Sequence, residues 1–260
     1  MDGVNMLSKK YKNKPNKNKR PLNKFESFRK GLERNKIFFE VLVTLSLSTM
    51  ALFVSCQANT IASNQTAIAE AENMPVFEIK STQVYDDDRK EYTEHKVKIA
   101  NEGGPIYGFD SDVVTFLNID YLDNKDGYIN KNIRVPLRGY FTASLVTSKV
   151  KGELATVQGY LNNNKLFDLT QEILNGPDAE EKFIDIEIQV YVKIRYEDFL
   201  HRYNEEYYYV PYLQTQKLSQ SEGENIFKEH SEALLSKGVE FLDLSRNKVI
   251  KIINEVNEDE

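Results

Sequence analysis

The feature that most constrains this chain is an apolar run of 20 residues at 37–56, IFFEVLVTLSLSTMALFVSC. As a helix, a run of this length covers about 30 Å, the thickness of the hydrocarbon core of a bilayer. Its one charge, Glu40, lies four residues after Lys36, so the two side chains can pair near the interface. The run predicts one transmembrane helix. A buried core helix is the alternative, although no polar stripe follows the helical period.

The charges around the run predict its orientation. Residues 9–36 hold 12 Lys or Arg and two acidic residues, Glu26 and Glu33. Because positively charged flanks stay in the cytoplasm, we expect the N-terminus inside the cell membrane and the domain that follows outside it. Residues 1–36 are predicted to be a basic, disordered cytoplasmic tail. The tail can contact anionic lipid headgroups, or serve as a topology signal alone, and we expect no nucleic-acid partner.

The part of the chain that follows the run is acidic, and the one cysteine lies at the end of the run. Residues 57–260 carry 22 basic and 36 acidic residues, a formal net charge of −14, whereas the whole chain has −6. Cys56 is the single cysteine, so it can pair two chains, carry a lipid or stay free. Residues 53–56, FVSC, look like a loose lipoprotein signal, which keeps a lipid anchor at Cys56 open. A cleaved secretory signal is disfavoured by the 36 residues before the run.

Residues 57–74 predict a helical stalk. Ile61 and Ile68 share one helical face and would suit a seam between two parallel copies, giving a homodimer, while a solvated spacer is the alternative. Pro75 is expected to end the helix, because proline in a helix interior costs about 3 kcal/mol.

Three short segments carry a resemblance. They are VSCQANTIA at 54–62, AIAEAENMPVFEI at 67–79 and NEGGPI at 101–106. The chain resembles single-pass membrane-anchored proteins of low-GC Gram-positive bacteria, which have an N-terminal span, a short Ala/Asn/Gln helical stalk and an extracytoplasmic β-domain. The resemblance implies a bacterial envelope protein, and it supplies no catalytic residues.

Residues 75–218 alternate apolar and polar side chains with the period of two that is typical of strands. The expected strands cover 76–85, 92–100, 107–122, 133–137, 184–196 and 205–213. A hairpin is predicted at 86–90, a helix at 165–174, and an edge strand at Pro136, which cannot donate to a ladder. This pattern predicts a mainly β fold with helices, a β-sandwich with an immunoglobulin-like form as one option; a curved open barrel is the alternative.

Residues 219–260 return to the helical period and predict a C-terminal helical segment. Ser221, with Glu224 three residues later, predicts a capping box at the start of the first helix. Ser245 is expected to cap the second helix.

The motifs of common enzymes and metal sites are absent from the sequence. His95, His201 and His230 fall on different expected elements, without the spacing of a zinc site. The acidic stretch at 120–127 places apolar residues where a calcium loop needs carboxylates, so a turn is expected there. No catalytic residue, cofactor or metal is predicted, although paired carboxylates assembled only in space stay open.

A group of tyrosines is the one candidate interaction surface. The strand at 184–196 is expected to pair with 205–213 as a long hairpin across a loop at 198–204, and the tyrosines crowd its second arm: Tyr203, Tyr207, Tyr208, Tyr209 and Tyr212. Alternation would place one set in the core and the other on the surface, where tyrosine suits an interface. The alternative is that these residues reflect only the β-propensity of tyrosine.

Taken together, the sequence predicts a non-enzymatic, membrane-anchored extracytoplasmic interaction domain with a protein partner or a second copy. An envelope hydrolase that acts on cell-wall sugar or peptide is one alternative. A membrane-tethered regulator that works through its basic tail is another.

Overall fold

The computed structural model describes residues 24–123, 129–177 and 182–258. The chain divides into two compact units, Met1–Thr66 and Ala67–Glu260. The expected acidic turn at 124–128 and most of the basic tail lie outside the described residues.

The first unit contains helix α1 (Lys24–Arg34) and most of α2 (Lys36–Glu72). Within the described residues, α2 is the one helix long and apolar enough to cross a membrane. The hydroxyls of Thr44, Ser46 and Thr49 each donate to the carbonyl four residues earlier at 2.8 Å, which satisfies them without water. The prediction of a helix able to span a membrane is confirmed, and the orientation stays a prediction.

Residues 24–34 form α1, where a disordered tail was expected. The expectation overlooked Phe25, Phe28 and Leu32, whose spacing places them on one helical face. Arg29 also pairs with Glu33, one turn later at 3.1 Å, which favours the helix.

The predicted stalk is part of α2, which continues unbroken to Glu72, three residues before Pro75. The chain then passes over the turn at Gly103 and Gly104, where a Cβ on either glycine would overlap the backbone of residues 73–76. Asn101, which is fully buried, fixes this crossing: its Oδ1 accepts from the backbone N–H of Val76 at 3.1 Å. The sequence predicted only a turn here, and the structure makes it the junction between helix and sheet.

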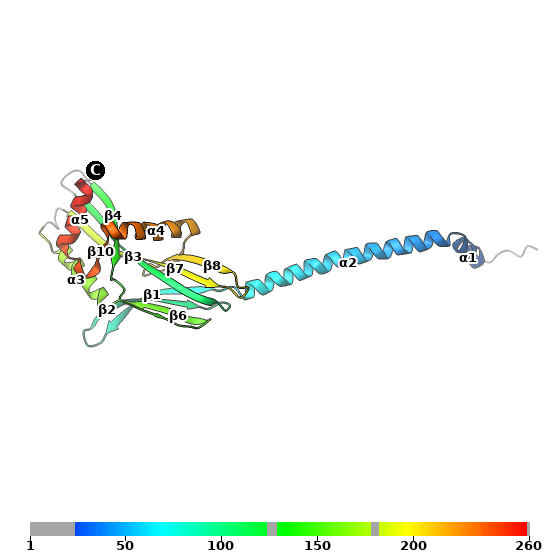
Figure 1. Ribbon diagram of the computed structural model, residues 1–260, viewed down its shortest axis with the longest axis horizontal. Coiled ribbons are helices and arrows are strands. Elements are labelled where there is room, and N and C mark those ends of the chain that lie inside the picture. Colours follow the sequence, from blue (N-terminus) through cyan, green and yellow to red (C-terminus); the bar gives the residue numbers. More distant parts are fainter. Residues whose placement is uncertain (1–23, 124–128, 178–181, 259–260) are drawn as a thin grey trace, which may run out of the picture. The chain divides into compact units, whose positions relative to one another are not determined.

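The second unit contains two sheets (Figure 1). The four-stranded sheet has the order β1-β2-β6-β5, from β1 (Phe77–Asp86), β2 (Glu91–Asn101), β5 (Ala143–Val146) and β6 (Gly152–Gln158). The six-stranded sheet has the order β10-β4-β3-β7-β8-β9, from β3 (Tyr107–Asp123), β4 (Ile129–Arg138), β7 (Lys182–Glu197), β8 (Tyr203–Tyr209), β9 (Gln216–Lys217) and β10 (Val239–Glu240). Strand pairs are antiparallel, with the exception of β10 beside β4.

One hydrophobic cluster draws residues from both sheets, for example Val97 and Ile99 from β2 and Leu117 and Ile119 from β3. A second, smaller cluster of Phe116, Tyr191 and Ile226 lies under helix α4 (Gln220–Lys237). Figure 1 shows α4 along the six-stranded sheet, with α3 (Asn162–Leu174) and α5 (Arg246–Glu258) near one end of the sheets. A short 3-10 helix, η1 (Phe241–Asp243), precedes α5.

The fold is mixed rather than mainly β, since helices hold 42% and strands 38% of the described residues. The predicted hairpins β1–β2 and β7–β8 are both present, whereas β5 and β6 were missed. Pro136 lies in β4, which pairs with β3 and, over two residues only, with β10. The immunoglobulin-like arrangement stays a prediction.

The helix caps correct one prediction and confirm another. The N-cap of α4 is Ser219, whose Oγ accepts from the N–H of Glu222 at 3.3 Å, so the box predicted at Ser221 is wrong by two residues. Ser245 Oγ accepts from the N–H of Lys248 at 3.4 Å and caps α5 as expected.

Candidate functional site

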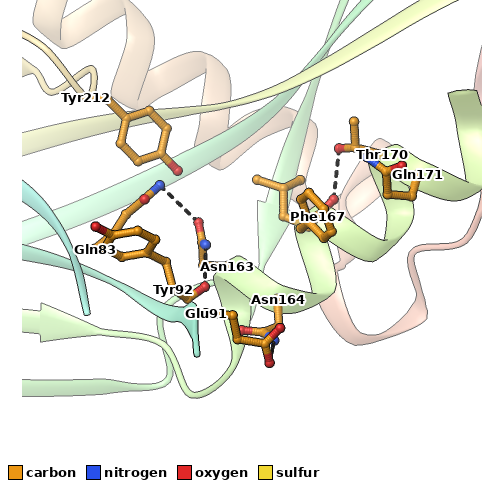
Figure 2. Close-up of a pocket in the computed structure, with 10 residues that line it drawn as sticks. Gln83, Glu91, Tyr92, Asn163, Asn164, Phe167, Thr170, Gln171 and Tyr212 are labelled. Carbon is orange, nitrogen blue, oxygen red and sulfur yellow. Dashed lines mark hydrogen bonds between the residues drawn. The ribbon is translucent and has the colours of Figure 1, made fainter. Parts of the chain in front are cut away.

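A pocket of about 520 Å³ lies between the β1–β2 hairpin, α3 and the segment that follows β8. Its walls carry amides, aromatic rings and a single carboxylate. The lining residues are Gln83, Glu91, Tyr92, Asn163, Asn164, Leu166, Phe167, Thr170, Gln171 and Tyr212. Figure 2 shows Tyr212, Gln83 and Tyr92 on one side and Phe167, Thr170 and Gln171 along α3 on the other.

Asn162, at the start of α3, fixes the helix against the four-stranded sheet. Its side chain is 1% exposed, its Oδ1 accepts from the backbone N–H of His95 at 2.7 Å, and its Nδ2 donates to the Tyr140 carbonyl at 3.1 Å. The preceding residue, Leu161, takes a left-handed conformation with φ 53°, which turns the chain into the helix. These directional contacts position α3 and with it one wall of the pocket.

His95 is buried behind the pocket wall that faces α3. It is 1% exposed, with Nε2 at 2.7 Å from Ser81 Oγ and Nδ1 at 2.9 Å from the Tyr140 hydroxyl. Burial lowers the pKa of His95 to about 4, so the ring is neutral at pH 7. Burial raises the pKa of Tyr140, and the charge of Tyr212 and a hydrogen bond with it raise that pKa further.

The ring of Tyr212 packs against His95, with ring centroids 4.9 Å apart. Tyr212 is thereby held in place although it is 41% exposed. Because both its ring and its hydroxyl have partners, Tyr212 presents a fixed aromatic surface to the pocket.

The amides of the pocket are linked by hydrogen bonds. Gln83 Nε2 donates to Asn163 Oδ1 at 3.2 Å, and Asn163 Nδ2 donates in turn to the Tyr92 carbonyl at 2.6 Å. Asn164 Nδ2 donates to Glu91 Oε1 at 2.6 Å. Its Oδ1 is buried and accepts no hydrogen bond.

Two further aromatic rings border the opening. Tyr92 is 53% exposed and packs edge-on against Tyr85, with centroids 5.2 Å apart. Phe167 projects from α3 and is 60% exposed. Exposed rings of this kind beside a pocket are expected to contact whatever binds there.

The chemistry of this lining suits binding rather than proton transfer. Glu91 is the one carboxylate among the lining residues, and an amide donates to it. No Lys, Arg or His belongs to the lining. Across the described residues, no group of three or more His, Cys, Asp or Glu side chains is arranged to hold a metal ion.

The predicted tyrosine surface is divided by the structure. Tyr207 and Tyr208 are both buried, Tyr209 is half-buried, and Tyr203 and Tyr212 are exposed. The expectation of one exposed set on β8 is wrong, because α4 covers the second face of the strand. Tyr207 contacts Phe227 of α4, with ring centroids 5.5 Å apart.

The buried tyrosines of β8 are held by neighbouring carboxylates. Tyr208 and Tyr196 both donate to Glu206, which also pairs with Lys217 at 2.7 Å. Burial, and then the hydrogen bond to Glu206, raise the pKa of Tyr208. These contacts give Tyr208 a structural role, and Tyr212 is the one predicted surface tyrosine that lines the pocket.

Sequence reasoning missed most of this pocket. The available signal was the run Asn162-Asn163-Asn164, which directly precedes the helix expected at 165–174. Asparagine favours caps and turns, and three together offer many donors and acceptors at one place. The partners Gln83, Glu91 and Tyr92 come from a distant hairpin that no local pattern connects to α3.

Comparison of the chain with known protein families and with curated proteins gave no match.

Proposed function

We propose that this chain is a single-pass membrane protein that displays a β-sandwich domain outside the cytoplasmic membrane, where the pocket beside α3 binds a ligand without chemical conversion. The observation that carries the proposal is the lining of the pocket, in which amides, exposed rings and one amide-bound carboxylate surround about 520 Å³. That volume falls in the range of about 300–1,000 Å³ that is typical of small-molecule sites.

The membrane part of the proposal rests on the sequence and on α1 and α2. The basic flank before α2 favours a cytoplasmic N-terminus, and α2 is long and apolar enough to span a bilayer. Phe25 and Phe28 of α1 are exposed beside basic residues, a pattern that suits the headgroup region of an anionic leaflet.

A hydrolase is the second candidate, because Ser81 Oγ lies 2.7 Å from His95 Nε2. A serine nucleophile needs a base that accepts its proton near neutral pH and a group that stabilises the resulting imidazolium. His95 has its pKa lowered to about 4, and its second nitrogen faces the Tyr140 hydroxyl rather than a carboxylate. The pair therefore fits a structural hydrogen bond better than an activated nucleophile.

A fluorophosphonate probe, which labels activated serines, separates these two candidates. We expect no labelling of the full-length protein at neutral pH. Labelling that disappears in Ser81→Ala, while Ser144→Ala keeps it, would favour the hydrolase. Ser144 is exposed on β5 and serves as the matched control.

Topology is tested with single cysteines, since Cys56 is the only natural one. In a Cys56→Ser background, Leu213→Cys and Phe25→Cys each place one thiol at an exposed position. A membrane-impermeant maleimide applied to intact cells should label the first variant, and the second only after lysis. The reverse pattern would refute display outside the membrane.

Binding is tested by sedimentation of the solubilised full-length protein with isolated cell envelopes. We expect the wild type to sediment and Phe167→Ala to stay in solution. Leu174→Ala is the control, because Leu174 is exposed on the same helix but does not line the pocket. Equal sedimentation of both variants, or none of the wild type, would contradict the role of the pocket.

A further inference from the structure

We infer that the ligand of the α3 pocket is a neutral glycan, bound through its hydroxyls by the amides and through the C–H face of a sugar ring by the aromatic side chains. This inference rests on the proposed function and names its ligand class. Three independent properties of the pocket lead to it: its charge, its hydrogen-bonding groups and its rings.

The charge of the lining excludes strongly ionic ligands. A phosphate or carboxylate ligand would meet no cation among the lining residues. Lys165, the nearest basic residue on α3, donates instead to the Leu242 carbonyl and lies over the Phe241 ring. A metal ion would find one carboxylate, Glu91, already bound by Asn164.

The hydrogen-bonding groups suit a ligand with many hydroxyls. An amide offers donors and an acceptor in one plane, and a hydroxyl is both donor and acceptor, so the two match in either orientation. The amides of Gln83, Asn163 and Gln171 belong to the lining, so a ligand meets both donors and acceptors there. A sugar hydroxyl can pair with either kind of group without bringing a charge into the site.

The amides are also held in fixed orientations before a ligand arrives. The chain from Gln83 to Asn163 to the Tyr92 carbonyl determines which way the Asn163 amide points, and Glu91 does the same for Asn164. Such preorganisation lowers the entropy that binding must remove. It is most useful for a ligand whose hydroxyls have fixed directions, as they have on a pyranose ring.

The rings supply the remaining contact. Tyr92, Phe167 and Tyr212 are exposed at the pocket and come from three separate elements. Figure 2 shows Phe167 across the space from Tyr212 and Tyr92. The negative face of an aromatic ring attracts C–H groups, and a pyranose has a face formed of C–H bonds between its hydroxyls. A quaternary ammonium ligand would also contact rings, but it would leave the amides unused.

The test measures binding of defined sugars to the full-length protein in lipid nanodiscs by calorimetry. The probes are the tetramers of β-linked N-acetylglucosamine, β-linked glucose and α-linked glucose, with choline chloride and inorganic phosphate as ionic probes. We expect at least one tetramer to bind and both ionic probes to fail.

The variants place the binding in this pocket. Phe167→Ala should weaken the binding about tenfold or more, in line with the loss of one aromatic contact of a desolvated ligand. Leu174→Ala should leave the Kd unchanged. Asn164→Leu should abolish binding, whereas Asn175→Leu, an exposed change at the end of the same helix, should not. Thermal unfolding of each variant separates a lost contact from a lost fold.

The outcomes distinguish this inference from the proposed function. If no tetramer binds although the wild type still sediments with envelopes through Phe167, the glycan inference fails and the binding function stands. Binding of choline or phosphate in place of the tetramers also overturns the inference. Tetramer binding that Phe167→Ala and Asn164→Leu leave unchanged places the sugar elsewhere and overturns it as well.

Discussion

Helices α3 and α4 both pack against the sheets of the second unit, but the surfaces between helix and sheet differ in kind. Beneath the first half of α4 the contact is apolar and filled: Gly223 lies directly on the Tyr207 ring, and Ile226 packs with Phe116 and Tyr191. A pocket of about 380 Å³ remains near the C-terminal end of α4, beside β4. Beneath α3, Leu169 and Ile173 join the main core, but the start of the helix is held by the hydrogen bond between Asn162 and His95, and a pocket of about 520 Å³ remains beside it.

The difference shows how one small domain can combine a closed interface with an open one. Apolar side chains gain from every contact, so they fill the space between the elements. Hydrogen bonds need only the correct direction and distance, so a few buried amides can hold the end of a helix while the space beside them stays open. The two helices therefore predict different responses to substitution.

The largest loss in the free energy of unfolding is expected when Asn162 is replaced. In Asn162→Ala, the His95 N–H and the Tyr140 carbonyl lose their buried partner. Each unsatisfied group costs about 1–3 kcal/mol, so the free energy of unfolding should fall by about 4 kcal/mol, measured by urea denaturation. The control Asn175→Ala changes an exposed asparagine at the end of α3 and should cost less than about 1 kcal/mol. Similar losses in the two variants would show that α3 is not held through Asn162.

The second effect is a dependence on pH that arises at His95. Its pKa is about 4 in the folded state against 6.5 ordinarily, so the unfolded chain binds the proton more tightly. The stability that comes from burying His95 in its neutral form is complete above pH 6.5. It is lost as the pH falls toward 4, and the loss is about 3 kcal/mol.

The variant His95→Gln should remove that share of the pH dependence when unfolding is measured at several pH values. His201→Asn is the control, since His201 is exposed and asparagine tolerates its positive φ of 57°. The control should keep the acid sensitivity of the wild type. A His95→Gln variant with the full wild-type slope would show that another group is responsible.

The third effect tests the filled interface. Gly223→Ala places a methyl group on the buried Tyr207 ring, and such overpacking costs about 1–3 kcal/mol even though alanine favours the helix. Ser231→Ala, at an exposed position of α4, should be neutral or slightly stabilising in the same thermal unfolding measurement. A Gly223→Ala variant as stable as the wild type would mean that the α4 contact is looser than described.

The smallest effect compares one substitution at both helices. Phe227→Ala on α4 removes a half-buried ring and should lower the free energy of unfolding by about 1–2 kcal/mol. Phe167→Ala on α3 removes an exposed ring and should change it by less than about 0.5 kcal/mol while it weakens ligand binding. The contrast fails if Phe167 proves to be the more stabilising of the two.

The strands and helices with a clear period could be predicted from the sequence. The alternation from 184 to 196 matches β7, and the acidic hairpin at 86–90 joins β1 to β2. The strands β5 and β6 were missed because β5 is a four-residue edge strand and both lie among turn-forming residues. Short edge strands have little pattern of their own, since pairing with a neighbour defines them.

The site was less predictable than the fold. The tyrosines of β8 were expected to have an exposed face, but alternation cannot show that α4 returns to cover it. The pocket joins Gln83, Glu91 and Asn164 across more than 70 residues of sequence, as the contacts of Asn164 with Glu91 and of Gln83 with Asn163 show. Only tertiary structure brings such residues together, because no local propensity connects a hairpin to a helix that follows four intervening strands.

The β1–β2 hairpin has a mechanical consequence. β1 begins at Phe77, next to the glycine junction, and reaches the pocket at Gln83, six residues or about 20 Å along the strand. Tension between an anchor in the membrane and a ligand in the pocket would run along this strand. The hydrogen bonds between β1 and β2 are perpendicular to the strands, so they would bear the load together in shear. Single-molecule pulling from residue 25 and residue 167, on the α3 wall of the pocket, would reveal this as one high rupture force, and a gradual low-force opening would contradict it. A domain built in this way would hold the proposed ligand under tension.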